Sequence, residues 1–166
     1  MKIAIAYATK TGTTREAAQK LAEQLQARGY TIQLCNLADT KPDADADAVA
    51  LGGSIRAGRW HTLAVQYAKQ NEATLLGKPL ALFACRCGKE EMRPLLAGQI
   101  GGKLAGHAVY ADGFGGVMDP AKQKGFERFI VNMILKHDKS GNGAGPGILE
   151  ENILACADAL SRELAG

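Results

Sequence analysis

Several features that assign a chain to a particular class of protein are scarce or missing in this sequence of 166 residues. It has no run of Lys and Arg, and only 5% of its residues are aromatic, so nothing indicates a nucleic-acid-binding surface. No apolar stretch is long enough to cross a bilayer, and the N-terminal apolar run is too short for a secretory signal. The four cysteines form no disulfide scaffold. We therefore expect one globular domain, residues 1–166, located in the cytoplasm.

The spacings typical of metal sites and of nucleotide-binding loops are missing as well. Cys85 and Cys87 lie two residues apart, but no second Cys/His pair lies at a separation suited to zinc. Asp43, Asp45 and Asp47 alternate with alanine, without the glycine and the later glutamate of a calcium loop. Neither a Walker A motif nor a GxGxxG motif follows the first apolar run. We expect no bound metal and no ligand held through a pyrophosphate.

The sequence does contain a regular alternation of short apolar runs and helical patterns. The predicted strands are residues 2–7, 30–37, 48–52, 80–85 and 107–111, and the predicted helices begin near Thr13, His61, Met92 and Leu149. The first, third and fourth strands are almost entirely apolar, as expected of strands buried on both faces. Such alternation predicts an α/β fold, in which helices cover both faces of a parallel sheet.

Two of the predicted helices carry one apolar face each. In the first helix, Ala17, Leu21 and Leu25 recur at four-residue spacing. In the last helix, the residues expected to face inward are Ile153, Cys156, Ala157 and Leu160. Both helices are therefore expected to pack on the sheet.

A long segment, residues 114–147, separates the fifth strand from the last helix. It exceeds the usual length of a loop in such a fold, which makes it a candidate functional insert. Its predicted helix, within 120–139, has surplus apolar surface and carries five Lys/Arg against two acidic residues. A basic helix of this kind is compatible with contact to an anionic membrane surface. The alternative is that the helix buries both sides within the domain.

A threonine-rich turn joins the first strand to the first helix. Its residues are Thr9, Lys10, Thr11, Gly12, Thr13 and Thr14. The N–H groups that open a helix attract a phosphate, and threonine hydroxyls can donate further hydrogen bonds to it. Helix capping alone would need only one threonine, so four threonines around a glycine favour a ligand. The turn predicts a site for a single terminal phosphate.

The pattern Thr9-x-Thr11-Gly12-x-Thr14 after the first strand resembles the phosphate-binding loop of the flavodoxin family. In order and spacing of elements, the resemblance covers essentially the whole chain. It implies a flavodoxin-like three-layer sandwich, with a five-stranded parallel sheet in the order 2-1-3-4-5. It also implies an FMN cofactor, with its phosphate in the threonine-rich turn and its ring against the loops after the third and fourth strands.

The resemblance assigns cofactor-binding residues to those two loops. They are Gly53, Ser54, Ile55, Arg56, Ala57, Gly58 and Trp60 after the third strand, and Cys85, Arg86, Cys87 and Gly88 after the fourth. Trp60 would either stack on the ring or pack the loop against the protein. The fourth-strand loop lacks the tyrosine that flavodoxins often stack on the ring, so an interaction domain without flavin stays open as an alternative.

The segment Gly53-Ser54-Ile55-Arg56-x-Gly58-x-x-His61 is similar to the flavodoxin-like protoporphyrinogen oxidases that pass electrons to menaquinone. This similarity implies an FMN-dependent oxidoreductase in which Arg56, Arg59 and His61 meet an anionic porphyrin. Arg56 and His61 are the candidate catalytic residues, and a quinone or a redox partner protein takes the electrons. Helix 120–139 would then bring the protein to the inner face of the membrane. The alternative is an electron-carrier flavodoxin, so whether the chain is an enzyme stays open at this point.

Overall fold

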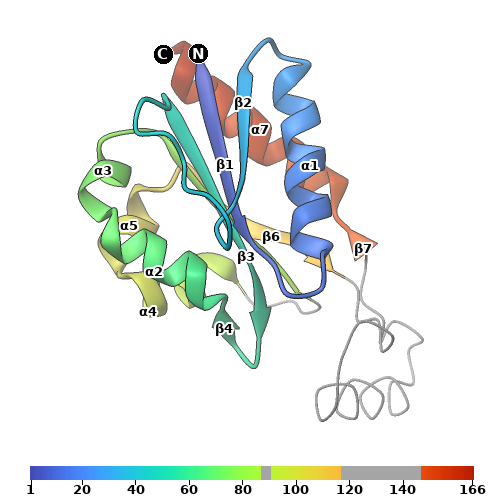
Figure 1. Cartoon of the computed structure of the whole chain (residues 1–166), viewed down its shortest axis with the longest axis vertical. Helices are drawn as coiled ribbons and strands as arrows, with labels where there is room; N and C mark the ends of the chain where they lie inside the picture. Colours follow the sequence, from blue (N-terminus) through green and yellow to red (C-terminus); the bar gives the residue numbers. More distant parts are fainter. Residues whose placement is uncertain (87–90, 117–146) are drawn as a thin grey trace.

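The computed structural model describes residues 1–86, 91–116 and 147–166 (Figure 1). The strands are β1 (Lys2–Ala8), β2 (Thr31–Asn36), β3 (Ala48–Arg56), β4 (Arg59–Trp60), β5 (Leu80–Cys85), β6 (Tyr110–Gly116) and β7 (Gly147–Ile148). The helices are α1 (Thr13–Gln26), α2 (Thr62–Gln70), α3 (Glu72–Leu76), α4 (Met92–Ile100), α5 (Gly102–His107) and α7 (Glu150–Ala165). Helices follow β1, β4, β5 and β7, close to the predicted starts, whereas β2 and β3 are joined without a helix.

The strands form one sheet in the order β2-β1-β3-β5-β6-β7, and β4 pairs with β3 outside this path. The pairs β1–β2, β1–β3, β3–β5 and β5–β6 are parallel. The five principal strands thus have the predicted parallel order, which is confirmed. The two short strands β4 and β7 are antiparallel additions that the sequence did not predict.

Helices cover both faces of this sheet, so that the described residues form three layers (Figure 1). Helices α1 and α7 pack on one face, and α2, α3, α4 and α5 pack on the other. Alternate residues of β1 serve the two sides: Ile3 and Ile5 face α1 and α7, while Ala4 and Ala6 face the other layer. A strand that is apolar throughout is therefore explained by burial on both faces.

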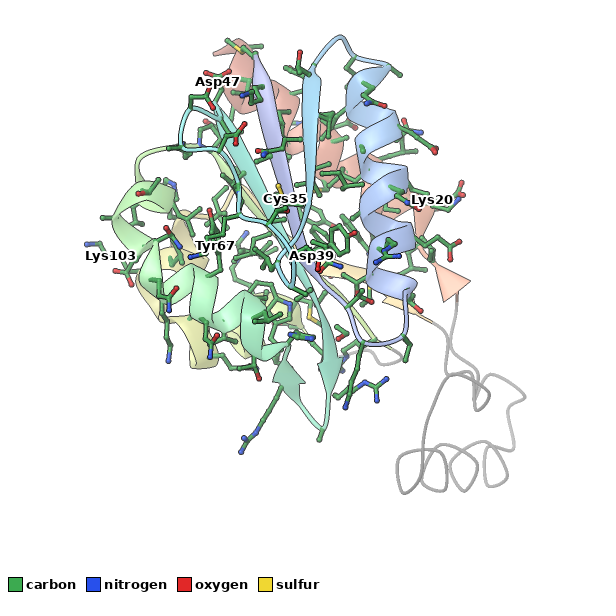
Figure 2. The ribbon with its side chains drawn as sticks, in the orientation of Figure 1. Lys20, Cys35, Asp39, Asp47, Tyr67 and Lys103 are labelled. Carbon is green, nitrogen blue, oxygen red and sulfur yellow. The ribbon has the colours of Figure 1, made fainter. Side chains whose placement is uncertain are left out.

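The predicted helical faces are also those that the structure buries. In α1 they include Ala17, Leu21 and Leu25, and in α7 they are Ile153, Cys156, Ala157 and Leu160. At the outer surface, Lys20 of α1 and Glu150 of α7 form a salt bridge of 3.1 Å (Lys20 is labelled in Figure 2). Because such exposed ion pairs contribute little, the apolar faces hold these two helices on the sheet.

The observed strand boundaries differ from the prediction most at the end of β3 and at both ends of β6, which runs to Gly116 and not to residue 111. β3 extends to Arg56 instead of ending at Gly52, because its last residues pair with β4 in a hairpin. The fifth principal strand begins at Tyr110 and not at residue 107, because His107 ends α5. There His107 Nε2 lies 2.9 Å from the carbonyl oxygen of Lys78, a contact that fixes the end of the helix near the start of β5.

The residues on either side of the long insert lie next to each other in the sheet. Gly116 pairs with Gly147, and Gly115 pairs with Ile148, where β6 and β7 run antiparallel. Leu149 N–H donates a hydrogen bond of 2.8 Å to the carbonyl oxygen of Phe114 and extends this contact. The helix predicted within 120–139 lies outside the described residues, as does the rest of the predicted insert from residue 117 to residue 146, a stretch that includes its glycine-rich part. The two ends of the insert are therefore neighbours at the carboxyl end of β6.

Gly52 generates a prediction about stability, because a Cβ atom built on it would lie 2.0 Å from the Phe83 ring. We expect Gly52→Ala to lower the free energy of unfolding by about 1–3 kcal/mol, since the ring must leave its packed position. Gly98→Ala is the matched control: Gly98 lies in α4, and its added Cβ would meet nothing within 4 Å. The control should gain about 0.5–1 kcal/mol through helix propensity. Urea unfolding measures both, and a Gly52→Ala protein as stable as the wild type would contradict this packing.

Candidate functional site

The segments predicted to bind a ligand meet at the carboxyl edge of the sheet. Because β1, β3 and β5 are parallel neighbours, the chain leaves all three strands at the same edge (Figure 1). Ala8 lies opposite Gly53, and Ser54 lies opposite Cys85. The threonine-rich turn, the hairpin after β3 and the loop after β5 are therefore brought together by the strand register.

The threonine-rich turn exposes the start of α1 without a side-chain cap. Gly12 occupies the N-cap position with φ 96°, a left-handed conformation that favours glycine, and as a glycine it has no side chain that could cap the helix. Thr9 instead folds the turn, since its Oγ1 accepts a hydrogen bond of 2.9 Å from Gly12 N–H. The first N–H groups of a helix have no partner within the helix, and together with the partial positive charge of this end they suit an anion.

Thr14 is a buried residue with an unusual hydroxyl. Its side chain is fully buried, and its Oγ1 has no conventional hydrogen-bond partner among the described residues. It lies beside the thiol of Cys85. Burial raises the pKa of this thiol to about 12, and the Thr14 hydroxyl acts in the opposite direction. An unsatisfied buried hydroxyl is costly, and a phosphate oxygen would accept its hydrogen. The donor set of the turn therefore fits a phosphate group.

A tight hairpin forms the second part of the site. Ile55 pairs with Trp60, Arg56 pairs with Arg59, and the two residues between them have positive φ angles, 50° for Ala57 and 72° for Gly58. Two such angles are what a type I′ turn requires. Ala57 is the non-glycine residue with positive φ in the part of the chain that the structure describes. The hairpin thus holds Arg56 and Arg59 at the carboxyl edge.

Gln99 of α4 fixes this hairpin, a role that no motif in the sequence signals. Its Oε1 accepts a hydrogen bond of 2.8 Å from Trp60 N–H, and its Nε2 donates one of 3.2 Å to the carbonyl oxygen of Gly58. A single side-chain amide therefore binds both the tip and the returning strand. Only the packing of α4 against β4 brings this residue into reach, since it is 39 positions from Trp60.

Trp60 lies in the core and not over an open site. Its side chain is 2% exposed, and its Nε1–H donates a hydrogen bond of 3.2 Å to the carbonyl oxygen of Gly53. A Cβ atom on Gly53 would lie 2.9 Å from that nitrogen, so the missing side chain is what admits the indole. The sequence left two roles for Trp60, stacking on the ring or packing the loop against the protein. The buried position of the indole in this structure matches the packing role.

His61 begins α2 and stands close to two cationic side chains. Its Nδ1 accepts a hydrogen bond of 3.1 Å from Leu63 N–H and so caps the helix. The pKa of this ring is lowered from its ordinary value, first by burial and then by the charges of Lys10 and Arg56. Lys10 belongs to the threonine-rich turn and Arg56 to β3, so His61 lies where the two parts of the site meet.

The other residues predicted to bind the cofactor lie partly in strands and partly in loops, and two of them are outside the described residues. Ser54, Ile55 and Arg56 belong to β3 itself and not to a loop. Cys85 ends β5 as a buried thiol, and Arg86 N–H donates a hydrogen bond of 2.9 Å to the carbonyl oxygen of Gly115. Cys87 and Gly88 lie outside the described residues. The loop after β5 is thus connected to the strand from which the insert starts.

The described residues contain neither a cluster of metal-binding side chains nor a helix that could span a membrane. No group of three or more His, Cys, Asp or Glu side chains within residues 1–86, 91–116 and 147–166 could hold a metal ion. Over the same ranges, no helix has the length and apolar character needed to span a membrane. Lys10, Arg56 and Arg59 bring positive charge to the threonine-rich turn and the hairpin, and no acidic residue occurs between positions 48 and 63; the first turn of α1 contains one acidic residue, Glu16.

Comparisons with known proteins agree with this geometry. A sequence model of the family described as "Flavodoxin domain" matches residues 4–143. The protoporphyrinogen IX dehydrogenase (quinone) of Escherichia coli K12 is 24% identical over 144 residues, which covers 82% of this chain and 80% of that protein. Among solved structures, a flavodoxin from the domain Archaea superposes with a TM-score of 0.60 at 16% identity, covering 99% of both chains. Oxidised flavodoxin 1 from Bacillus cereus gives 0.59 at 16% identity, covering 97% of this chain and 98% of that one.

The lowered pKa of His61 predicts how stability depends on pH. Between the ordinary pKa near 6.5 and the lower folded value, the unfolded chain binds a proton that the folded chain does not. Stability therefore falls as the pH drops through this window. His61→Asn keeps an oxygen that caps the helix but does not titrate. We expect the free energy of unfolding of the wild type to decrease relative to His61→Asn from pH 8 to pH 5, measured in urea; a constant difference would contradict the assignment.

Proposed function

The chain belongs to the flavodoxin domain family, and from this premise we propose that it binds FMN and transfers electrons through it. The observation that carries the proposal is the threonine-rich turn, with the uncapped start of α1 and the unpaired buried hydroxyl of Thr14. A phosphomonoester would satisfy both features at once. When bound, FMN supplies the redox chemistry, while the protein sets its orientation, its surroundings and its access.

The phosphate would be held by hydroxyls and backbone N–H groups of one short segment. Thr9 already accepts a hydrogen bond from Gly12 N–H, which leaves its own hydroxyl hydrogen available for donation. Thr11 is half-buried, and Thr14 approaches from inside the first turn of α1. Lys10, which is exposed, adds a positive charge at the same place. This set of donors suits one terminal phosphate and needs no glycine-rich pyrophosphate loop.

The flavin ring would lie against the hairpin and the loop after β5. From the first segment we propose Gly53, Ser54, Ile55, Arg56, Ala57 and Gly58, and from the second Cys85, Arg86, Cys87 and Gly88. Since Trp60 is buried and hydrogen-bonded to Gly53, it is left out of the ring-binding set. Two hydrogen bonds from Gln99 support the assignment of the hairpin to the ring-binding site. They hold its backbone in one conformation, as a binding site requires.

We further propose that the protein is an oxidoreductase that takes electrons from an anionic porphyrin and passes them to a quinone. Its relative from E. coli is named for protoporphyrinogen IX and quinone. The cationic edge around Lys10, Arg56 and Arg59, with no acidic residue from position 48 to 63, supports a substrate that carries carboxylates. An electron carrier that docks on a redox partner protein is the second candidate. Membrane contact through residues 120–139 remains a proposal from sequence.

The assignment of the phosphate can be tested with Thr14→Val, an isosteric change. Loss of a charge-assisted hydrogen bond of about 1.5–3 kcal/mol should weaken FMN binding by roughly 10- to 100-fold, with much less effect on riboflavin, which lacks the phosphate. Removing an unpaired buried hydroxyl should leave the flavin-free protein as stable as the wild type or more so.

Calorimetric titration with FMN and with riboflavin, together with urea unfolding, gives both readouts. Thr11→Val should weaken FMN in the same selective way. Thr31→Val is the matched control, because Thr31 is exposed at the start of β2, on the edge strand beyond β1. Equal losses of affinity for FMN and riboflavin would refute the phosphate assignment, and no binding of FMN to the wild type would refute the function.

Enzyme and carrier are distinguished by turnover. The protein reconstituted with FMN should convert protoporphyrinogen to protoporphyrin in the presence of a soluble quinone analogue, followed by porphyrin fluorescence. Arg56→Gln should lower kcat/KM by about tenfold or more, since it removes a charge that pairs with a substrate carboxylate. Lys103→Gln, on the distant helix α5, removes a charge outside the site and should not change it (Figure 2). A rate no higher than that without protein would favour the carrier.

A further inference from the structure

His61 is held in one orientation by its position at the start of a helix. Its Nδ1 accepts the hydrogen bond from Leu63 N–H at 3.1 Å. Its carbonyl oxygen accepts from Ala64 and Val65 N–H, at 3.0 and 3.1 Å, which begins the helix on the backbone side. Rotation of the imidazole would break the side-chain cap and leave an N–H group of α2 without a partner. The ring is therefore a fixed group and not a freely rotating one.

This hydrogen bond decides which ring nitrogen carries the hydrogen. A neutral imidazole has one N–H group and one lone pair. Because Nδ1 uses its lone pair to accept from Leu63, the hydrogen lies on Nε2. A second proton would have to enter at Nδ1, facing the N–H of Leu63, at the positive end of a helix. Burial and the charges of Lys10 and Arg56 oppose it as well, which is why the pKa of the ring is lowered.

The surroundings of His61 place it between the two segments proposed to hold FMN. Its Cβ lies 3.2 Å from the point where a side chain on Gly53 would begin, so it packs directly on the end of β3. Gly53 is paired with Ala8, from which the chain enters the threonine-rich turn. Lys10 of that turn and Arg56 before the hairpin both act on the ring electrostatically. His61 thus stands at the junction of the phosphate-binding and ring-binding segments.

We propose that His61 is a neutral, fixed hydrogen-bond donor toward the bound flavin, acting through Nε2–H, and that it does not serve as a general base. This inference rests on the proposed binding of FMN. A base needs a free lone pair at the atom that faces the reacting group, and the cap leaves Nε2 without one. A donor without net charge favours the negative charge that the flavin gains on reduction. His61 therefore acts by positioning a hydrogen bond that strengthens as the flavin is reduced.

Three substitutions separate this role from helix capping. His61→Ser keeps an oxygen that can cap α2 but cannot reach as far as the imidazole. His61→Asn keeps the cap and offers an N–H group of its own, so it is the conservative variant. His61→Ala removes both functions. Folding stability therefore reports on the cap, and the redox potential of bound FMN reports on the donor.

We expect His61→Ser to weaken the binding of reduced relative to oxidised flavin by about tenfold, a shift of about 30 mV to more negative potential for the two-electron couple. Its unfolding transition should stay close to that of the wild type. His61→Ala should show the same shift and a less stable fold, and His61→Asn should restore part of the potential. Equilibration with a reference dye of known potential measures the first quantity, and urea unfolding measures the second. A wild-type potential in His61→Ser would overturn the proposal.

The tautomer can be measured without any flavin. Long-range proton–nitrogen correlation spectra of the imidazole, recorded above the pKa of the ring, should assign the hydrogen to Nε2; a hydrogen on Nδ1 would overturn the proposal. Titration of the wild type with FMN separates this inference from the proposed function. Failure of FMN to bind would remove both, whereas normal binding with an unchanged potential in His61→Ser would remove the role of His61 alone.

Discussion

The parallel pairing of β1, β3 and β5 is the constraint on which the rest of this structure depends. It fixes Ala8 beside Gly53 and Ser54 beside Cys85, so three loops that are far apart in the sequence begin at one edge. The strands can pair in this way only because both faces of the sheet are covered by helices. The threonine-rich turn, the hairpin and the loop after β5 follow from that arrangement, since each of them continues a buried strand at this edge.

Two adjacent glycines adapt the end of β3 to its neighbours on opposite faces. Gly52 lies under the ring of Phe83, which stacks on Phe114 with centroids 4.5 Å apart. Gly53 faces the other layer, where it receives the indole of Trp60. A side chain at either position would displace an aromatic ring from the core. Because Gly53 has no side chain, Trp60 and His61 can pack directly on β3 next to β1. The same glycines therefore determine both the packing of the core and the geometry of the site.

The electrostatics of the site distinguish the part that we propose for the phosphate from the part that we propose for the flavin ring. At the start of α1, uncapped N–H groups, the buried Thr14 hydroxyl and Lys10 all favour an anion. At the start of α2, the side chain of His61 accepts a hydrogen bond from the N–H of Leu63, and burial and the charges of Lys10 and Arg56 lower the pKa of its ring. Two helix ends at the same edge of the sheet therefore differ: the N-cap residue of α1 is a glycine without a side chain, whereas the N-cap side chain of α2 accepts a hydrogen bond from the helix.

Local pattern in the sequence was enough for the order of the principal strands and helices, the buried faces of α1 and α7, and the turn that opens α1. Each of these depends on residues a few positions apart, whose spacing alone decides which face is apolar or where a helix begins. The family resemblance added the strand order. Tertiary structure alone decided that Ser54–Arg56 continue β3 and that Trp60 fills the core. It also decided that Gln99 binds the hairpin and that Nδ1 of His61 is occupied. These features depend on contacts between distant segments, such as Gly58 with α4, and no local spacing encodes them.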